Sequence, residues 1–134
     1  MGTIYVARSA TFSEWASDVG LSKNVFKLGY TDEPPEEVVK ANWGGAEDWT
    51  IVKKKAADSL DEAEMIAKMA RREKMIDPNY YPRLRGTTGI FKVPPEKVEN
   101  SILVAKSMAN ETISKLPKAK PADFADYLIQ NALK

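Results

Sequence analysis

Short segments that favour strands alternate with helix start signals along most of this sequence, and that alternation limits the fold more than any other feature. Segments 3–8, 25–30 and 49–54 combine β-branched and aromatic residues, a composition typical of strands. A fourth short strand is predicted at 89–93. Because these strands are interspersed with helices and two helices end the chain, the pattern predicts an α+β domain with a small sheet of three to four strands.

Five helices are predicted from capping residues, prolines and apolar spacing. Capping boxes at Thr11–Glu14 and Ser59–Glu62 start two of them, because a hydroxyl and an acid three residues later satisfy free N–H groups at a helix start. Proline pairs at 34–35 and 94–95 start two others, since proline is well tolerated in the first helical turn. The predicted helices cover residues 11–19, 35–41, 59–70, 94–116 and 122–133.

The chain has 134 residues, the usual size of one domain. We expect this domain to span 1–116, with a linker and a C-terminal helix at 117–134 packed on it.

With no cysteine and no histidine, disulfides, thiolate or imidazole metal sites and histidine-based catalytic triads are excluded. No apolar stretch approaches the roughly 18 to 20 residues of a bilayer span. The sequence therefore predicts a cytoplasmic protein without a membrane partner.

Charge is distributed unevenly along the chain, although its net charge is only +1. Residues 1–66 contain seven basic and twelve acidic side chains, whereas residues 67–92 contain seven basic and two acidic ones. Arginine and lysine interleaved with tyrosine suit phosphate contact and base stacking. A solvated helix face followed by a basic loop is the alternative interpretation. The candidate nucleic-acid-binding residues are Arg71, Arg72, Tyr80, Tyr81, Arg83, Arg85 and Lys92.

Four short motifs occur in an order that is similar to a known family. They are Gly-Thr-Ile-Tyr at 2–5, Lys-Leu-Gly at 27–29, Glu-Met-Ile-Ala at 64–67 and the segment from Gly86 to Val93. Their order resembles that of the GIY-YIG nuclease superfamily, in particular its small phage- and mobile-element-type branch. The resemblance covers about residues 2–105 and implies a small, mainly antiparallel sheet flanked by helices.

The resemblance also implies a chemistry, which is hydrolysis of phosphodiester bonds in DNA or RNA with Mg²⁺ or Mn²⁺. In that interpretation Glu64 binds the metal, Tyr5 positions or deprotonates a water, and Lys27 contacts a phosphate. A carboxylate suits such a hard cation, and the metal both activates the attacking oxygen and neutralises charge on the phosphate. A single carboxylate is a poor cage, so substrate phosphate would have to complete the coordination.

The sequence departs from the family pattern where active members carry an arginine, about eight residues after the motif glycine. Glu37 stands at that spacing, one insertion reaches Val38, and the first basic residue is Lys40. An acid there would repel a phosphate, and loss of one preorganised donor costs on the order of a hundred- to a thousand-fold in rate.

The second hypothesis is therefore an inactive binding module, for example a phage or mobile-element accessory protein. It would bind nucleic acid, or a protein partner through the acidic segment 32–37.

Each catalytic candidate also has a plain structural interpretation. Tyr5 is equally explained as a half-buried strand tyrosine, and Lys27 as a lysine at a sheet edge. Glu62 is interpreted as the last residue of its capping box, which leaves Glu64 as the better site candidate. Glu64 in turn has the spacing of a surface ion pair with Lys68.

Overall fold

A five-stranded antiparallel sheet forms the centre of the computed structural model, which describes residues 2–21, 23–57, 60–78, 80–81, 84, 87–109 and 119–133. Its strand order is β3-β1-β2-β5-β4. The central strand β1 pairs with both β2 and β3, and β5 links β2 to the edge strand β4. The strands are β1 (Gly2–Arg8), β2 (Val25–Thr31), β3 (Thr50–Ala57), β4 (Lys74–Met75) and β5 (Ile90–Lys92).

The α+β prediction is confirmed, including an antiparallel sheet flanked by helices and two C-terminal helices. The predicted strand count of three to four was too low by the two-residue strand β4. A segment of two residues is too short to show the alternation from which strands are predicted. It becomes a strand because Lys74 and Met75 pair with Lys92 and Phe91 of β5.

The helices begin near the predicted positions, but two of them use a different capping residue. The helices and 3₁₀ turns are α1 (Ala10–Asp18), α2 (Pro35–Val38), η1 (Val39–Ala41), η2 (Trp43–Gly45), α3 (Glu62–Ala70), α4 (Pro95–Met108) and α5 (Pro121–Ala132). Ser9, not Thr11, caps α1, because its hydroxyl accepts the Phe12 N–H at 3.0 Å. Asp61 caps α3, and the predicted capping residue Ser59 lies outside the described residues. The predicted continuation of α4 to Leu116 lies outside the described residues.

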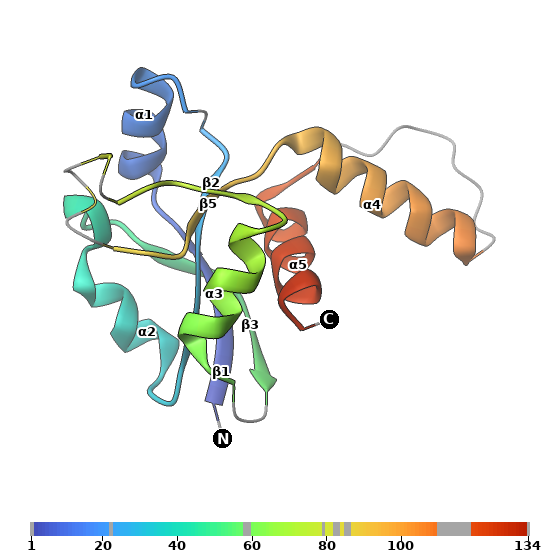
Figure 1. Cartoon of the computed structure of the whole chain (residues 1–134), viewed down its shortest axis with the longest axis horizontal. Coiled ribbons are helices and arrows are strands. Elements are labelled where there is room, and N and C mark those ends of the chain that lie inside the picture. The colour runs from blue at the N-terminus through green and yellow to red at the C-terminus, as the bar shows by residue number, and fades with distance from the viewer. Residues whose placement is uncertain are drawn as a thin grey trace.

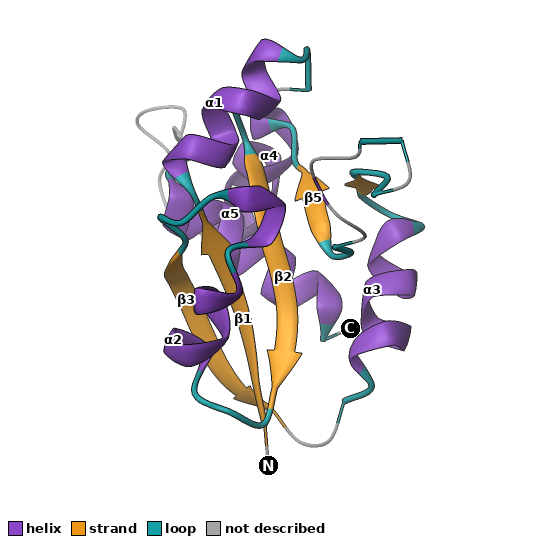
Figure 2. Ribbon diagram, turned by 90° about the vertical axis from the view of Figure 1, so that its left-hand side faces the viewer, coloured by secondary structure: helices purple, strands orange, loops and turns teal. Residues whose placement is uncertain are grey.

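Two apolar cores cover the two faces of the sheet. On one face, side chains of β1 and β2 pack against α3 and α5, with Phe26 stacked on Phe124 at 5.0 Å. On the other face, β1 and β2 pack against α1 and the α2–η2 segment. Figure 2 shows β3, β1, β2 and β5 side by side, with α3 alongside the β2–β5 end of the sheet.

The helix α4 extends away from the rest of the domain (Figure 1). Of its side chains only Val98 is buried, while Val104 and Met108 are exposed. Its base is held by Glu73, a buried carboxylate that accepts hydrogen bonds from Lys97 of α4 and Tyr127 of α5, at 3.2 and 2.6 Å. None of the helices in the described ranges has the length and apolar character needed to cross a membrane.

Candidate functional site

The motif glycines Gly2 and Gly29 make room for tyrosines of the neighbouring strand. Tyr5 lies directly opposite Gly29 in the β1–β2 register, and a methyl group on Gly29 would overlap the Tyr5 hydroxyl. A methyl group on Gly2 would likewise overlap the ring of Tyr30. The order of glycine and tyrosine in the two strands is therefore a packing requirement of this pair of strands.

Tyr5 and Lys27 lie next to each other on one face of the sheet. Because Ala7 is opposite Lys27 and Tyr5 is opposite Gly29, the two side chains are diagonal neighbours, within reach of each other. The Lys27 Nζ lies 5.9 Å from the centre of the Tyr5 ring and donates a hydrogen bond to the Leu28 carbonyl at 3.1 Å. Both residues are buried, with 2% and 4% of their surface exposed.

Trp43 covers this pair from the η2 turn. Its ring is stacked on Tyr5 at 6.2 Å with an interplanar angle of 12°, and the Lys27 Nζ lies 5.0 Å from its centre. Trp49 anchors Trp43 by donating its Nε1–H to the Trp43 carbonyl at 2.8 Å. An ammonium within about 6 Å of an aromatic ring centre is stabilised by cation–π attraction, and the Lys27 Nζ has two such rings. We call Tyr5, Lys27 and Trp43 the closed cluster.

The carboxylate whose charge acts on both Tyr5 and Lys27 is that of Glu62, a residue interpreted from the sequence as part of a capping box. β5 pairs with β2 only over Val25–Lys27, so the β2 edge is open further along the strand. There the Glu62 Oε2 accepts the Tyr30 N–H at 2.8 Å. Its position at the sheet edge brings its charge close enough to affect both Tyr5 and Lys27.

Glu64 is not brought to the closed cluster. It occupies the N3 position of α3, where its N–H donates to the Asp61 carboxylate at 3.2 Å. Residues two apart on a helix point in nearly opposite directions, so Glu64 faces away from Glu62. It is exposed and lines a shallow hollow with Ala67, Lys68 and Arg71.

Burial shifts the pKa of both titratable groups in the closed cluster, Tyr5 and Lys27. Burial raises the pKa of Tyr5, and the negative charge of Glu62 raises it further. Tyr5 is therefore a neutral phenol near neutral pH and is unsuited to the role of general base. Burial lowers the pKa of Lys27 to about 8, although the charge of Glu62 opposes this shift.

Glu37, which stands at the spacing of the arginine in the similar family, forms a surface ion pair. Lys40 binds Glu37 at 3.0 Å, with side chains that are 71% and 60% exposed. Lys54 of β3 binds Glu36 at 2.5 Å. These lysines are directed to the acids at the start of α2, so they supply no cation to the closed cluster.

The metal site implied by the family resemblance was tested against the side chains that would form it. No group of three or more carboxylate, imidazole or thiol side chains comes together within the described ranges. Glu62 is a single carboxylate that already accepts a backbone N–H. Because Mg²⁺ and Mn²⁺ favour several oxygen ligands, the described residues do not fit such an ion by themselves.

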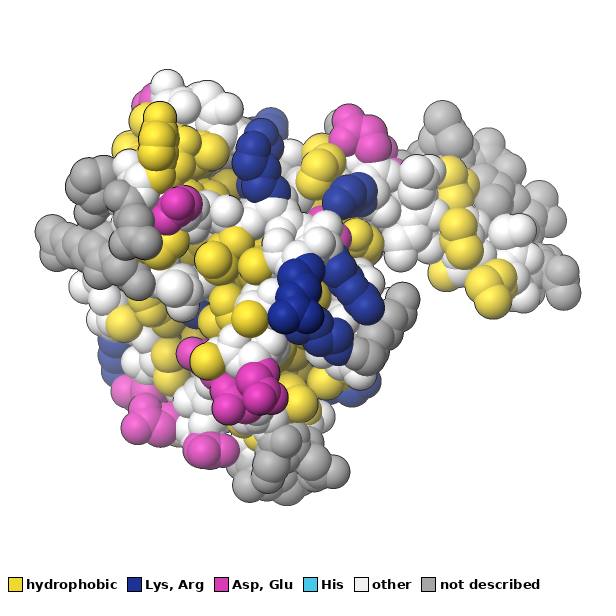
Figure 3. All heavy atoms as spheres, in the orientation of Figure 1, with side chains coloured by type: hydrophobic (Ala, Val, Ile, Leu, Met, Phe, Trp, Pro, Cys, Tyr) yellow, Lys and Arg dark blue, Asp and Glu magenta, His cyan; other side chains and the backbone are white. Residues whose placement is uncertain are grey.

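Basic side chains gather instead on α3 and at the β4–β5 edge of the sheet. Arg71, Arg72 and Lys74 are exposed, and Lys92 is half-buried directly opposite Lys74. We call these four residues the basic edge. Figure 3 shows Lys and Arg side chains gathered on this face of the molecule beside α3. Arg83 and Arg85, which were predicted to belong to the same surface, lie outside the described residues.

The two predicted tyrosines have different environments. Tyr81 packs edge-on against Trp15, with ring centres 5.7 Å apart. Tyr80 contacts Tyr81 at 4.8 Å and leaves 73% of its surface exposed. Both line a pocket together with Lys74 and Lys92, so the structure brings these two tyrosines to the basic edge.

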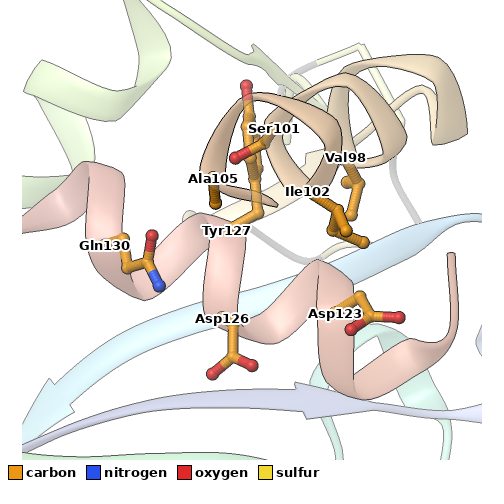
Figure 4. Close-up of a pocket in the computed structure, with 8 residues that line it drawn as sticks. All are labelled: Val98, Ser101, Ile102, Ala105, Asp123, Asp126, Tyr127 and Gln130. Atoms are coloured by element: carbon orange, nitrogen blue, oxygen red, sulfur yellow. The ribbon is translucent and has the colours of Figure 1, made fainter. Parts of the chain in front are cut away.

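Another hollow lies between α4 and α5 (Figure 4). Its acidic side chains, Asp123 and Asp126, point away from α4 in that view, and Asp126 is held by Lys53 at 2.8 Å. The Tyr127 hydroxyl donates to Glu73. The carboxylate of Asp126 and the hydroxyl of Tyr127 are thus directed to partners outside this hollow, which does not favour a ligand site there.

Comparison with known proteins adds no relative. No family model matches the chain, and no match to it was found among curated proteins or solved structures.

Proposed function

We propose that this chain is a divergent GIY-YIG-like domain that binds DNA or RNA through its basic edge. The observation that carries the proposal is the contrast in exposure between the two lysine-containing regions. Lys27 is 4% exposed beneath Trp43, whereas Arg71, Arg72 and Lys74 face solvent. A phosphate backbone needs exposed cations, so the closed cluster serves the fold and the basic edge serves the ligand.

The pairing of the lysines supports this division. Lys40, Lys53, Lys54 and Lys97 each have a carboxylate oxygen within 3.2 Å. Within the described ranges, Lys74 and Lys92 have no such ion pair and lie directly opposite each other. Like charges opposite each other destabilise a strand pair, and an anionic ligand would relieve that repulsion.

The arginines of the basic edge add a donor geometry that suits the same ligand. A guanidinium presents a planar set of N–H groups that binds a phosphate in a bidentate manner. Arg71 and Arg72 follow α3 directly, where Arg71 lines a surface hollow and Arg72 is exposed. Phosphate contacts of this kind carry no sequence information, so we expect binding with weak sequence preference.

A salt titration of binding tests the proposal. Fluorescence anisotropy of a labelled duplex should give an affinity that falls with salt, and the Arg71→Ala, Arg72→Ala double variant should flatten the slope by about two units. The charge-matched control is Lys40→Ala, Lys55→Ala, on surfaces remote from the basic edge. Absence of binding at low salt, or equal slopes for both double variants, would contradict the proposal.

A metal-dependent nuclease is the second candidate. It is favoured by one observation, which is that Tyr5, Lys27 and Glu62 lie around the same stretch of β2. The binding proposal expects no cleavage of supercoiled or branched DNA with Mg²⁺ or Mn²⁺. Cleavage that disappears in a Glu62→Gln variant and persists in Glu64→Gln would establish the nuclease and overturn the binding role.

A further inference from the structure

The pocket at the basic edge combines cations, aromatic rings and an apolar floor. Lys74 and Lys92 lie on the same sheet face as Ile76, because side chains alternate along each strand, and all three line the pocket. Leu21 and Ile76 supply a buried apolar floor, with 8% and 3% of their surface exposed. Such a pocket has room for a flat, partly apolar group next to a negative charge.

The cations of this pocket are available for a ligand. Neither Lys74 nor Lys92 forms an ion pair with a carboxylate in the part of the chain that the structure describes. Asp77 is the acidic side chain among the lining residues. The charge of the lining is therefore positive, which is complementary to a phosphate.

The aromatic wall is held in place on one side and open on the other. Tyr81 is fixed by its edge-on contact with Trp15 at 5.7 Å and by its N–H, which donates to the Asp77 carbonyl at 3.2 Å. Tyr80 packs on Tyr81 at an interplanar angle of 71° and is 73% exposed. Because Tyr80 packs on a fixed neighbour, its exposed ring face is available for stacking at low entropic cost.

We infer that this pocket takes one unstacked base of a single-stranded nucleic acid, with Tyr80 stacking on the base and Lys74 and Lys92 contacting neighbouring phosphates. The inference rests on the proposed nucleic-acid binding and names its preferred form. Bases in a duplex are stacked on each other and offer no free face, whereas single strands offer every base. The protein should therefore bind a single strand more tightly than a duplex of the same length.

Anisotropy titrations of the full chain with a labelled short oligothymidylate and with a labelled duplex test the inference. Tyr80→Ala should weaken single-strand binding about fivefold or more, because one base–aromatic stack contributes that much, and should leave duplex binding unchanged. Tyr80→Phe should keep wild-type affinity, since the ring face remains. Lys74→Gln with Lys92→Gln should weaken both ligands, and the opposite-edge control Lys55→Gln neither.

Two results would overturn the inference and are distinguishable from failure of the proposed function. If wild-type protein binds the oligothymidylate and Tyr80→Ala binds it equally well, the stacking site is wrong while nucleic-acid binding stands. If Tyr80→Phe loses as much affinity as Tyr80→Ala, the hydroxyl and not the ring face is responsible, and stacking is again wrong. If neither ligand binds at low salt, both the inference and the proposed function fail.

Discussion

The closed cluster and the basic-edge pocket are built from the same residue types but have opposite exposure. Both combine lysine with aromatic rings on one face of the sheet. In the closed cluster the protein itself supplies partners for Lys27, among them the rings of Tyr5 and Trp43 and the Leu28 carbonyl. In the pocket Lys74, Lys92 and the face of Tyr80 are left for a ligand. The difference indicates that the centre of the sheet uses these residues for stability and its edge uses them for binding.

The largest expected effect is a difference in stability between two alanine variants, one at Tyr5 in the closed cluster and one at Tyr80 in the pocket. Tyr5→Ala should lower the free energy of unfolding by about 3–5 kcal/mol, because it removes a buried aromatic side chain. Tyr80→Ala should change the free energy of unfolding by no more than about 0.5 kcal/mol, because the ring is exposed. Chemical denaturation of both variants measures the contrast. Equal losses would show that the two regions do not differ as described.

The second prediction concerns the fit between Gly29 and Tyr5. Gly29→Ala should destabilise the protein by about 1–3 kcal/mol, because the added methyl overlaps the Tyr5 ring and hydroxyl. In a Tyr5→Phe background the same change should cost less, since the hydroxyl is gone. A double-mutant cycle in denaturant measures this coupling, and additive effects would contradict the close approach.

The third prediction uses the titration of Lys27. Its pKa is about 8 in the folded protein and 10.5 as an ordinary lysine, so between these pH values the unfolded chain binds a proton that the folded chain does not. Stability from this group therefore rises with pH over that window. Relative to Lys27→Met, the wild type should gain about 2 kcal/mol between about pH 8 and 10.

Denaturant unfolding of both proteins across that pH range measures the difference. Tyr5 and Glu62, the titratable groups beside Lys27, are present in both proteins, so the difference between the curves isolates Lys27. Parallel curves for wild type and Lys27→Met would mean that Lys27 is not buried in a closed cluster.

The smallest expected effect has the opposite sign and belongs to the basic edge. Lys92→Gln should raise the free energy of unfolding by about 0.2–1 kcal/mol at low salt, because it removes the like charge opposite Lys74. The gain should shrink as salt screens the repulsion. Thermal unfolding at low and high salt checks this. A loss of stability would mean that Lys92 has a stabilising partner, contrary to the account of the pocket.

The sequence was sufficient for the long elements and for which sheet face each residue of β2 occupies. Alternation puts Tyr30 on the opposite face from Lys27, and in the structure Tyr30 packs against the core that contains Phe26, whereas Lys27 contacts Tyr5. Strict alternation along an extended strand fixes such relations locally.

The site itself was less predictable, because it depends on helix starts and on contacts between distant segments. Both Ser59 and Asp61 are capping residue types, and the two-residue difference between them decides whether Glu62 or Glu64 belongs to the cap. The structure uses Asp61, so Glu62 is directed to the β2 edge. Trp43 reaches Tyr5 from a turn far along the chain, and no local pattern predicts that contact.

The most direct test of the account is an NMR titration of the isotope-labelled protein with an oligothymidylate, which reports where the ligand binds. The account predicts that amide shifts concentrate at Lys74, Tyr80, Tyr81 and Lys92 and leave Tyr5 and Lys27 unchanged. Shifts centred on Tyr5, Lys27 and Glu62 would contradict it, because they would show that the ligand enters the cluster that Trp43 covers.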